Sequence, residues 1–306
     1  MFSLVQKWRV YFLVSAVIFA LGIASMVYST ITIGTPFRIG IDFSNGTLLE
    51  LHFTNPVNTE DVRAVLVTAG HADAVVTKVQ VGTNQEDIVI RTKPIQSDEK
   101  QTLEALLSAK LGPLTEQQFS SVSAAIGAET ALAAVFAIIA AAAAILIFIA
   151  IAFYKVPKPF RWGVCAIVEM LHDIFILLSF ISIMGVLANW EVDSLFLTAV
   201  LTVAGFSVED AIVVFDRIRE NLVRGSYPDF EKTVAVSVYE MLPRTINTSF
   251  LVWVILLVLY FFGGSSIKYF VLALLIGIFS GTYSSILNAS PLLVTWEEFK
   301  AKRKKV

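Results

Sequence analysis

The chain has little charge, one cysteine and three histidines among its 306 residues. Charged residues form 16% of it, against about a quarter in soluble domains. The lone Cys165 excludes an internal disulfide, and the net charge of −2 provides no positive field for nucleic acid. Gly-rich phosphate loops, nucleophile elbows and metal-ligand spacings are missing. We therefore expect a non-enzymatic protein that needs no cofactor or metal and binds no nucleic acid.

Apolar sequence is abundant instead. Hydrophobic residues make up 56% of the chain, and the mean hydropathy is +0.74. They fall into blocks that match the ~20 residues needed to cross a bilayer. We predict transmembrane helices near residues 10–30, 130–153, 162–188, 194–216, 246–263 and 267–294. The first apolar run is interpreted as a retained helix rather than a cleaved signal peptide.

Lysine and arginine are distributed unequally between the predicted loops. If the N-terminus is cytoplasmic, the inner segments carry many basic residues, including those of the C-terminal tail, whereas the short outer loops carry only Lys268. The positive-inside rule therefore predicts that both termini are cytoplasmic.

Residues 31–122 alternate strand and helix patterns. The predicted strands are Thr47–Phe53, Val75–Val81, Asp87–Thr92 and Gln117–Val122. Helix signals begin at Asn58 and at Ser97 and end near Gly70 and Gly112. The order β-α-β-β-α-β predicts a ferredoxin-like sandwich, a fold that does not specify a function.

The expected architecture is an all-α bundle of six transmembrane helices with one extracytoplasmic α+β domain of ferredoxin-like fold. A cytoplasmic amphipathic helix is expected over Asp229–Met241, ending at Pro243. The predicted parts are residues 1–30 (first transmembrane helix), 31–122 (extracytoplasmic domain), 123–217 (helices two to four), 218–243 (cytoplasmic loop and amphipathic helix), 244–294 (helices five and six) and 295–306 (basic cytoplasmic tail).

Ionisable side chains inside the spans are the best guide to function, because each costs about 2.5–3.5 kcal/mol in hydrocarbon. The candidates are Glu129, Glu169, His172, Asp173, Glu209, Asp210 and Arg244. Asp216 and Arg217 lie at the predicted inner membrane surface, where docking and orientation explain them. Small residues in span six, such as Ser280 and Ser284, favour close helix packing.

Asp210 precedes Arg217 by seven residues, about 10 Å of helix, and so lies inside the membrane. Arg244 begins span five on the same side of the membrane. Its long side chain, if it points inward, reaches Asp210. A buried carboxylate beside an arginine stays ionised, and it takes up a proton when the arginine moves away. Asp210 is therefore either a proton carrier or half of a static ion pair between spans four and five.

Glu169, His172 and Asp173 share one face of span three, at positions i, i+3 and i+4. A histidine beside an aspartate can relay protons near neutral pH. The alternative is a self-satisfied polar cluster that holds helices together. The residues alone leave both interpretations open.

Several long motifs of the chain resemble those of one membrane-protein family. GFSVEDAIVVFDRIREN at residues 205–221, which includes Gly205, Asp216 and Arg217, is similar to a span-four signature. GIDFSNGT at residues 40–47, with Asp42, Gly46 and Thr47, is similar to the pattern G-x-D-F-x-G-G-T. His172-Asp173 and RTINTS at residues 244–249 match further motifs of the same family. By these motifs, nearly the whole chain resembles the SecF family of protein-export membrane proteins.

The resemblance implies a function in protein export. It implies SecD as a heterodimer partner, the SecYEG translocon and YajC as further partners, and an exported preprotein chain as cargo. It also implies use of the proton-motive force in late translocation steps at a bacterial or archaeal-type cytoplasmic (inner) membrane, whose lipid surrounds the multi-pass chain. Asp210 and Arg244 match the family's proposed proton-path residues, while Glu209 departs from the family's usual asparagine.

Two rival functions remain at this stage. An exporter of small molecules or lipids of the related RND superfamily also carries a membrane aspartate, although such exporters usually have larger outside domains and two repeats. A scaffold with buried charges that never titrate is the other rival. An Asp210→Asn substitution separates the proton carrier from the scaffold.

Overall fold

The computed structural model describes residues 7–44, 46–72, 74–81, 85–152, 159–264 and 267–303. It divides into two compact units. One comprises Met1–Arg38 and Ala137–Val306, and the other is Ile39–Phe136. Asn45, part of the GIDFSNGT motif, lies outside the described residues.

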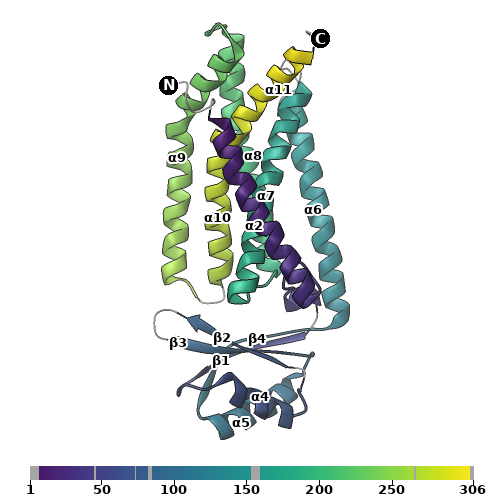
Figure 1. Ribbon diagram of the computed structural model, residues 1–306. Helices are drawn as coiled ribbons and strands as arrows, with labels where there is room; N and C mark the ends of the chain where they lie inside the picture. The colour runs from purple at the N-terminus through teal and green to yellow at the C-terminus, as the bar shows by residue number, and fades with distance from the viewer. Residues whose placement is uncertain are drawn as a thin grey trace. The chain divides into compact units, whose positions relative to one another are not determined.

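Long apolar helices form the first unit (Figure 1). They are α2 (Trp8–Ile33), α6 (Ala124–Ala152), α7 (Pro159–Ala188), α8 (Ser194–Val223), α9 (Phe230–Phe262) and α10 (Lys268–Ser284), with a π-helical turn η2 (Ser285–Ala289) and α11 (Ser290–Arg303) continuing α10. Six of these stretches are long and apolar enough to cross a bilayer, which confirms the predicted number of spans. The first part of α6 belongs to the other unit.

The centre of the bundle is formed by α7, α8 and the α10–η2–α11 helix. Half of the most apolar window of α7 is buried, against 6% of that of α6, so α6 leaves most of its surface to lipid or to another protein. Trp162 of α7 packs edge-on against Phe215 of α8 at 5.5 Å between ring centroids. Asp173 and Glu169, described below, are buried among these central helices.

Close packing of α10 on α8 depends on a glycine. A Cβ added to Gly277 would lie 2.2 Å from Cγ2 of Val203, well inside the ordinary carbon–carbon contact distance. The small residues of span six thus permit a close approach between helices, as the sequence predicted.

The predicted helix end at Pro243 is wrong, because α9 runs unbroken from Phe230 to Phe262. Proline removes one backbone donor, but Pro243 is exposed and the helix continues on both sides of it. Adding residues to an existing helix is far easier than starting a new one. The amphipathic segment and span five therefore form a single rod.

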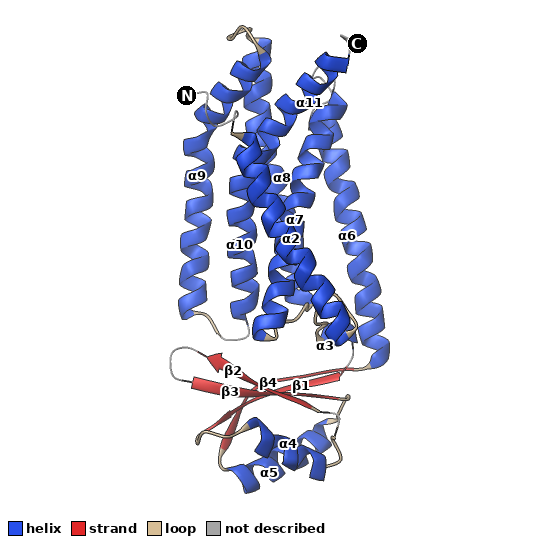
Figure 2. Cartoon of the chain, in the orientation of Figure 1, coloured by secondary structure: helices blue, strands red, loops and turns tan. Residues whose placement is uncertain are grey.

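The second unit is an antiparallel sheet covered on one face by two helices (Figure 2). A short helix, α3 (Ile41–Ser44), precedes it. The strands are β1 (Gly46–Phe53), β2 (Val75–Val81), β3 (Gln85–Thr92) and β4 (Leu114–Val122), and the helices are α4 (Thr59–Thr68) and α5 (Ser97–Leu111). The sheet order β2-β3-β1-β4 with this chain order confirms the ferredoxin-like prediction.

Alternation along β1 separates two environments. Leu49, Leu51 and other apolar residues join the core beneath the helices. Glu50 points to the opposite side and is also buried. Its burial, and secondarily the charge of Asp87, raises the pKa of Glu50 above its ordinary value.

Candidate functional site: a buried polar network in the bundle

Asp173 of α7 is the centre of a network of side-chain hydrogen bonds, and it is fully buried. Ser280 of α10 donates to its Oδ1 at 2.8 Å, and Ser284 donates to its Oδ2 at 2.7 Å. His172 places Nδ1 3.1 Å from Oδ1. Donors on α10 and α7 thus hold the two carboxylate oxygens. A change of charge on Asp173 therefore alters hydrogen bonds made by both helices.

His172 extends the network to the first span. Its Nε2 lies 2.7 Å from the Ser15 hydroxyl and 3.2 Å from the amide nitrogen of Asn288 in η2. An amide nitrogen can only donate, so Nε2 is an acceptor and Nδ1 carries the ring proton that faces Asp173. The imidazole therefore links α2 and η2 to Asp173 of α7, which in turn is bonded to α10.

Glu169 lies one turn from Asp173 on the same face of α7 and is 2% exposed. The Ser284 hydroxyl lies 3.4 Å from its Oε1, while its Oε2 has no hydrogen-bond partner among the residues that the structure describes. The charged groups that act on it are the carboxylates of Asp173 and of Asp210 on α8. Buried carboxylates gathered in this way repel one another when ionised, and a bound proton relieves that repulsion.

Asp210 faces this acidic cluster from α8 and is half-buried. The charges that act on it are those of Glu209 and Asp173. Within the described residues, no ion pair or hydrogen bond joins Asp210 to Arg244.

The direction of Arg244 explains this separation. Arg244 is exposed, whereas the next residue, Thr245, is 1% exposed. Successive helical residues point about 100° apart, so the register of α9 that buries Thr245 turns Arg244 outward. The structure thus brings together His172, Asp173 and Asp210, and leaves Arg244 apart from them.

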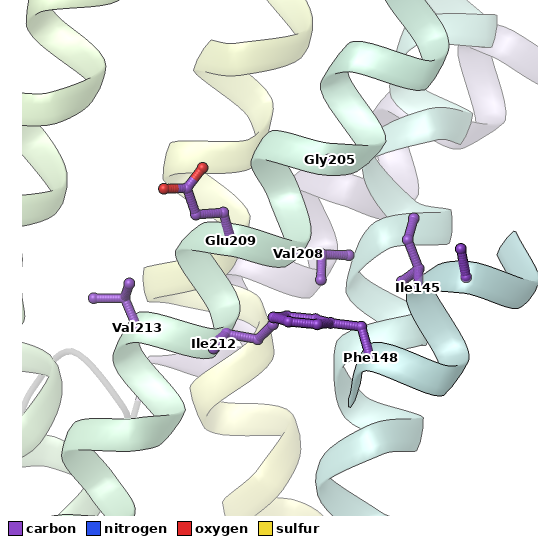
Figure 3. A pocket seen from close by; sticks show the side chains of 8 residues that line it. Ile145, Phe148, Gly205, Val208, Glu209, Ile212 and Val213 are labelled. Carbon is purple, nitrogen blue, oxygen red and sulfur yellow. The ribbon is translucent and has the colours of Figure 1, made fainter. Parts of the chain in front are cut away.

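Glu209 points to a different face of α8 from Asp210. With Gly205 it lines an apolar groove of about 430 Å³ between α6 and α8, and Figure 3 shows Phe148 of α6 reaching toward Ile212 across it. Glu209 is exposed, and a Cβ added to Gly205 would meet no atom within 4 Å. Both residues therefore belong to an open surface of the bundle, and the hydrogen-bonded network lies on the other side.

Asp216 and Arg217 lie at the end of α8, away from the network. Arg217 donates through Nε to Glu240 of α9 at 2.7 Å, and Asp216 pairs with Arg219 at 2.7 Å. The amide of Asn221 also donates to Glu240, at 3.0 Å. These contacts tie the ends of α8 and α9 together, which is a structural role.

The GIDFSNGT residues act within the α+β unit. Asp42 lies in α3, before the first strand. Gly46 has φ +131°, and a Cβ there would lie 2.9 Å from the Thr92 carbonyl oxygen, so glycine is required. The buried Thr47 hydroxyl accepts from the Ile95 backbone N–H at 3.0 Å and lies 2.7 Å from the Ser121 hydroxyl. The motif thus fixes the start of β1 against β3, β4 and the segment before α5.

Sequence reasoning missed the uncharged members of the network. They are Ser15, Ser280, Ser284 and Asn288. Ser207 of α8 is also buried, but its hydroxyl has no hydrogen-bond partner among the described residues and is not part of the network. Ser280, Ser284 and Asn288 recur every fourth residue, a spacing that places them on one side of a helix and could have signalled a polar stripe.

The fold and the network define a multi-span membrane protein that buries ionisable and hydroxyl side chains at the centre of its bundle. The family model described as protein export membrane protein SecD/SecF, C-terminal, matches residues 102–299. Protein translocase subunit SecF of Thermobaculum terrenum is 48% identical over 85% of this chain and 84% of its own length. SecF of Anaerolinea thermophila is 42% identical over 91% of each chain. The chain belongs to the SecF family of protein translocase subunits.

Solved structures of SecDF also resemble the chain. One is a crystal structure of SecDF, a translocon-associated membrane protein, from Thermus thermophilus, with a TM-score of 0.82 and 31% identity. It matches 96% of this chain, which spans only 38% of that longer polypeptide. Another is SecDF in a super-membrane-facing form, with a TM-score of 0.60 and 27% identity.

Proposed function

We propose that this chain acts with a SecD partner to draw on the proton-motive force and promote late steps of preprotein translocation through SecYEG. Membership of the SecF family supports the translocase role. The likeness to a solved SecDF structure supports a SecD-type partner. The role is non-enzymatic, and YajC is a further candidate partner.

The observation that carries the proton-coupling part is the arrangement of Asp210. It faces Asp173 and Glu169 inside the bundle, with Arg244 turned away from it. A cluster of buried acids without a nearby paired cation favours proton binding. A static clamp between Asp210 and Arg244, the alternative interpretation, is not formed among the described residues.

In the proposed cycle, protons enter from the outer side and reach Asp210. The described arrangement corresponds to the state in which Asp210 and Arg244 are apart, and proton release favours their approach. One charge moved across 100 mV supplies about 2.3 kcal/mol. At tenfold per ~1.4 kcal/mol, this biases a two-state motion of the outer α+β domain about 50-fold.

The proposed orientation follows the positive-inside rule, with both termini in the cytoplasm and the α+β unit outside the cytoplasmic membrane. In this orientation, Arg161 and the end of α8 that carries Arg217 lie at the cytoplasmic surface. The surrounding lipid contacts the exposed faces of α2, α6 and α9.

The test is Asp210→Asn in the full chain, assembled with its SecD partner in membrane vesicles. We expect proton-gradient-dependent export to fall to the level without a gradient, because the amide cannot take up and release a proton. Asp216→Asn is the matched control, since Asp216 lies on the same helix but is exposed and paired with Arg219.

The outcomes separate the rivals. If Asp210→Asn leaves gradient-dependent export unchanged, the proton-carrier role is wrong and a scaffold role remains. If the chain transports small molecules when purified without a partner, the RND-type exporter is correct instead.

A further inference from the structure

We propose that Glu169 is a second proton-accepting residue, reached from Asp173 through the hydroxyl of Ser284. This inference rests on the proposed function, because it extends the proton path beyond Asp210. It concerns a residue outside the motifs by which the chain resembles its family.

The Ser284 hydroxyl touches both carboxylates. Its Oγ lies 2.7 Å from Oδ2 of Asp173 and 3.4 Å from Oε1 of Glu169, and it also faces the Gly281 carbonyl at 3.2 Å. Ser284 is fully buried. A hydroxyl can donate and accept at once, so it can connect two acids that do not touch.

Glu169 has the free capacity that an acceptor needs. Its Oε2 is buried and makes no hydrogen bond within the described part of the chain. An unsatisfied buried acceptor costs free energy, which a bound proton with a new partner can recover. The titratable groups around it are Asp173 and Cys165 on α7 and Asp210 on α8. The cluster therefore offers Glu169 two acids from which a proton can come.

Glu169 also lies between Asp173 and the end of the bundle that carries Arg161. It is four residues, or about 6 Å, from Asp173 and eight residues, or about 12 Å, from Arg161. Arg161 is paired with Glu297 of α11 at that end of the bundle. A proton on Glu169 has thus moved one helical turn from Asp173 toward the Arg161 end.

The proposed step moves one proton from Asp173 to Glu169 through Ser284 and conserves both atoms and charge. Protonated Asp173 gives its proton from Oδ2 to Ser284 Oγ, while the Ser284 hydroxyl gives its own proton to Glu169 Oε1. One O–H bond breaks and one forms at Ser284, which stays neutral. The negative charge moves from Glu169 to Asp173, where the Ser280 hydroxyl and the His172 ring N–H stabilise it.

The first experiment measures gradient-dependent export by the full complex in vesicles. Glu169→Gln and Ser284→Ala should each lower it about a hundredfold, the lower range for a positioned proton-transfer group. Ser179→Ala is the matched control, because Ser179 is a fully buried serine of α7 whose hydroxyl donates to the Phe175 backbone carbonyl and not to the acids of the network. Its effect should stay within about fivefold, the scale of one hydrogen bond.

The second experiment is infrared difference spectroscopy of the purified complex during a pH change, which does not depend on export. Glu169→Gln should remove one protonated-carboxyl band. Ser284→Ala should keep that band but slow its appearance relative to the Asp173 band. An unchanged spectrum for Glu169→Gln, or equal export by the Ser284→Ala and Ser179→Ala variants, overturns the proposal.

The two proposals fail differently. If Asp210→Asn abolishes gradient-dependent export and Glu169→Gln does not, only the role of Glu169 is wrong. If neither substitution changes gradient dependence, the proposed function itself fails.

Discussion

The contact between Gly277 of α10 and Val203 of α8 gives the sharpest stability prediction. A Cβ at Gly277 would lie 2.2 Å from Cγ2 and 2.9 Å from Cγ1 of Val203. Rotating the valine only exchanges one methyl for the other, and its χ1 is stiff because Cβ is branched. Gly277→Ala must therefore push α10 away from α8.

The magnitude follows from the overlap. An ordinary contact needs about 3.5–4.0 Å between carbons, so the helices must separate by more than an ångström at this point. Overpacking of this kind costs about 1–3 kcal/mol of unfolding free energy. Val203→Ala in the same chain removes both methyl groups, and the double variant should be about 1–3 kcal/mol more stable than the sum of the two single effects.

The assay is reversible unfolding of the purified chain in mixed micelles with increasing denaturing detergent. Gly205→Ala is the matched control, because its Cβ would meet nothing within 4 Å. Alanine there should raise helix stability by up to about 1 kcal/mol. The reasoning is refuted if Gly277→Ala is as stable as the parent, or if Val203→Ala worsens the Gly277→Ala variant.

Three further predictions concern the α+β unit and the ends of α8 and α9. The raised pKa of Glu50 means that its contribution to stability is present below the unfolded-state pKa and is lost as pH rises through the folded-state pKa. Glu50→Gln should therefore raise the melting temperature of the unit at neutral pH and leave it nearly unchanged in acid; a drop at neutral pH would contradict this. Thr47→Val should cost about 1–3 kcal/mol by stranding the Ile95 N–H, visible as faster amide exchange there, while Thr47→Ser should cost less. A double-mutant cycle on Arg217 and Glu240 should give only a small coupling energy that falls with added salt, because solvent screens the pair; a coupling energy that does not change with salt would contradict this.

The spans and the ferredoxin-like unit were predictable because each rests on a pattern local in sequence. Apolar length fixes a transmembrane helix, and alternation such as that in Val75–Val81 fixes a strand. The continuity of α9 was harder to predict from the sequence. Pro243 predicts an end from local chemistry, but α9 passes through it, because an exposed proline within a packed rod loses only one backbone hydrogen bond.

The site was predictable only in part, because partners across helices come from packing. His172 and Asp173 were candidates because charge in the membrane is rare. Ser15 and Ser284 carry no charge and resemble ordinary small packing residues, so their hydrogen bonds to those two residues were invisible. The direction of Arg244 was equally inaccessible, since it depends on the rotation of α9 about its own axis.

The π-helical turn in span six connects these observations. Ser280, Ser284 and Asn288 follow one another at four-residue steps, and each such step in an α-helix overshoots a full turn by about 40°. In an unbroken α-helix, Asn288 would stand about 80° from Ser280. The turn at Ser285–Ala289 spreads more residues over one turn, which reduces the angle per residue and keeps Asn288 on the side of His172. Under the proposed function, a proton that alters the bonding of His172 or Asp173 therefore acts directly on this irregular turn, a place where a helix can change its winding at low cost.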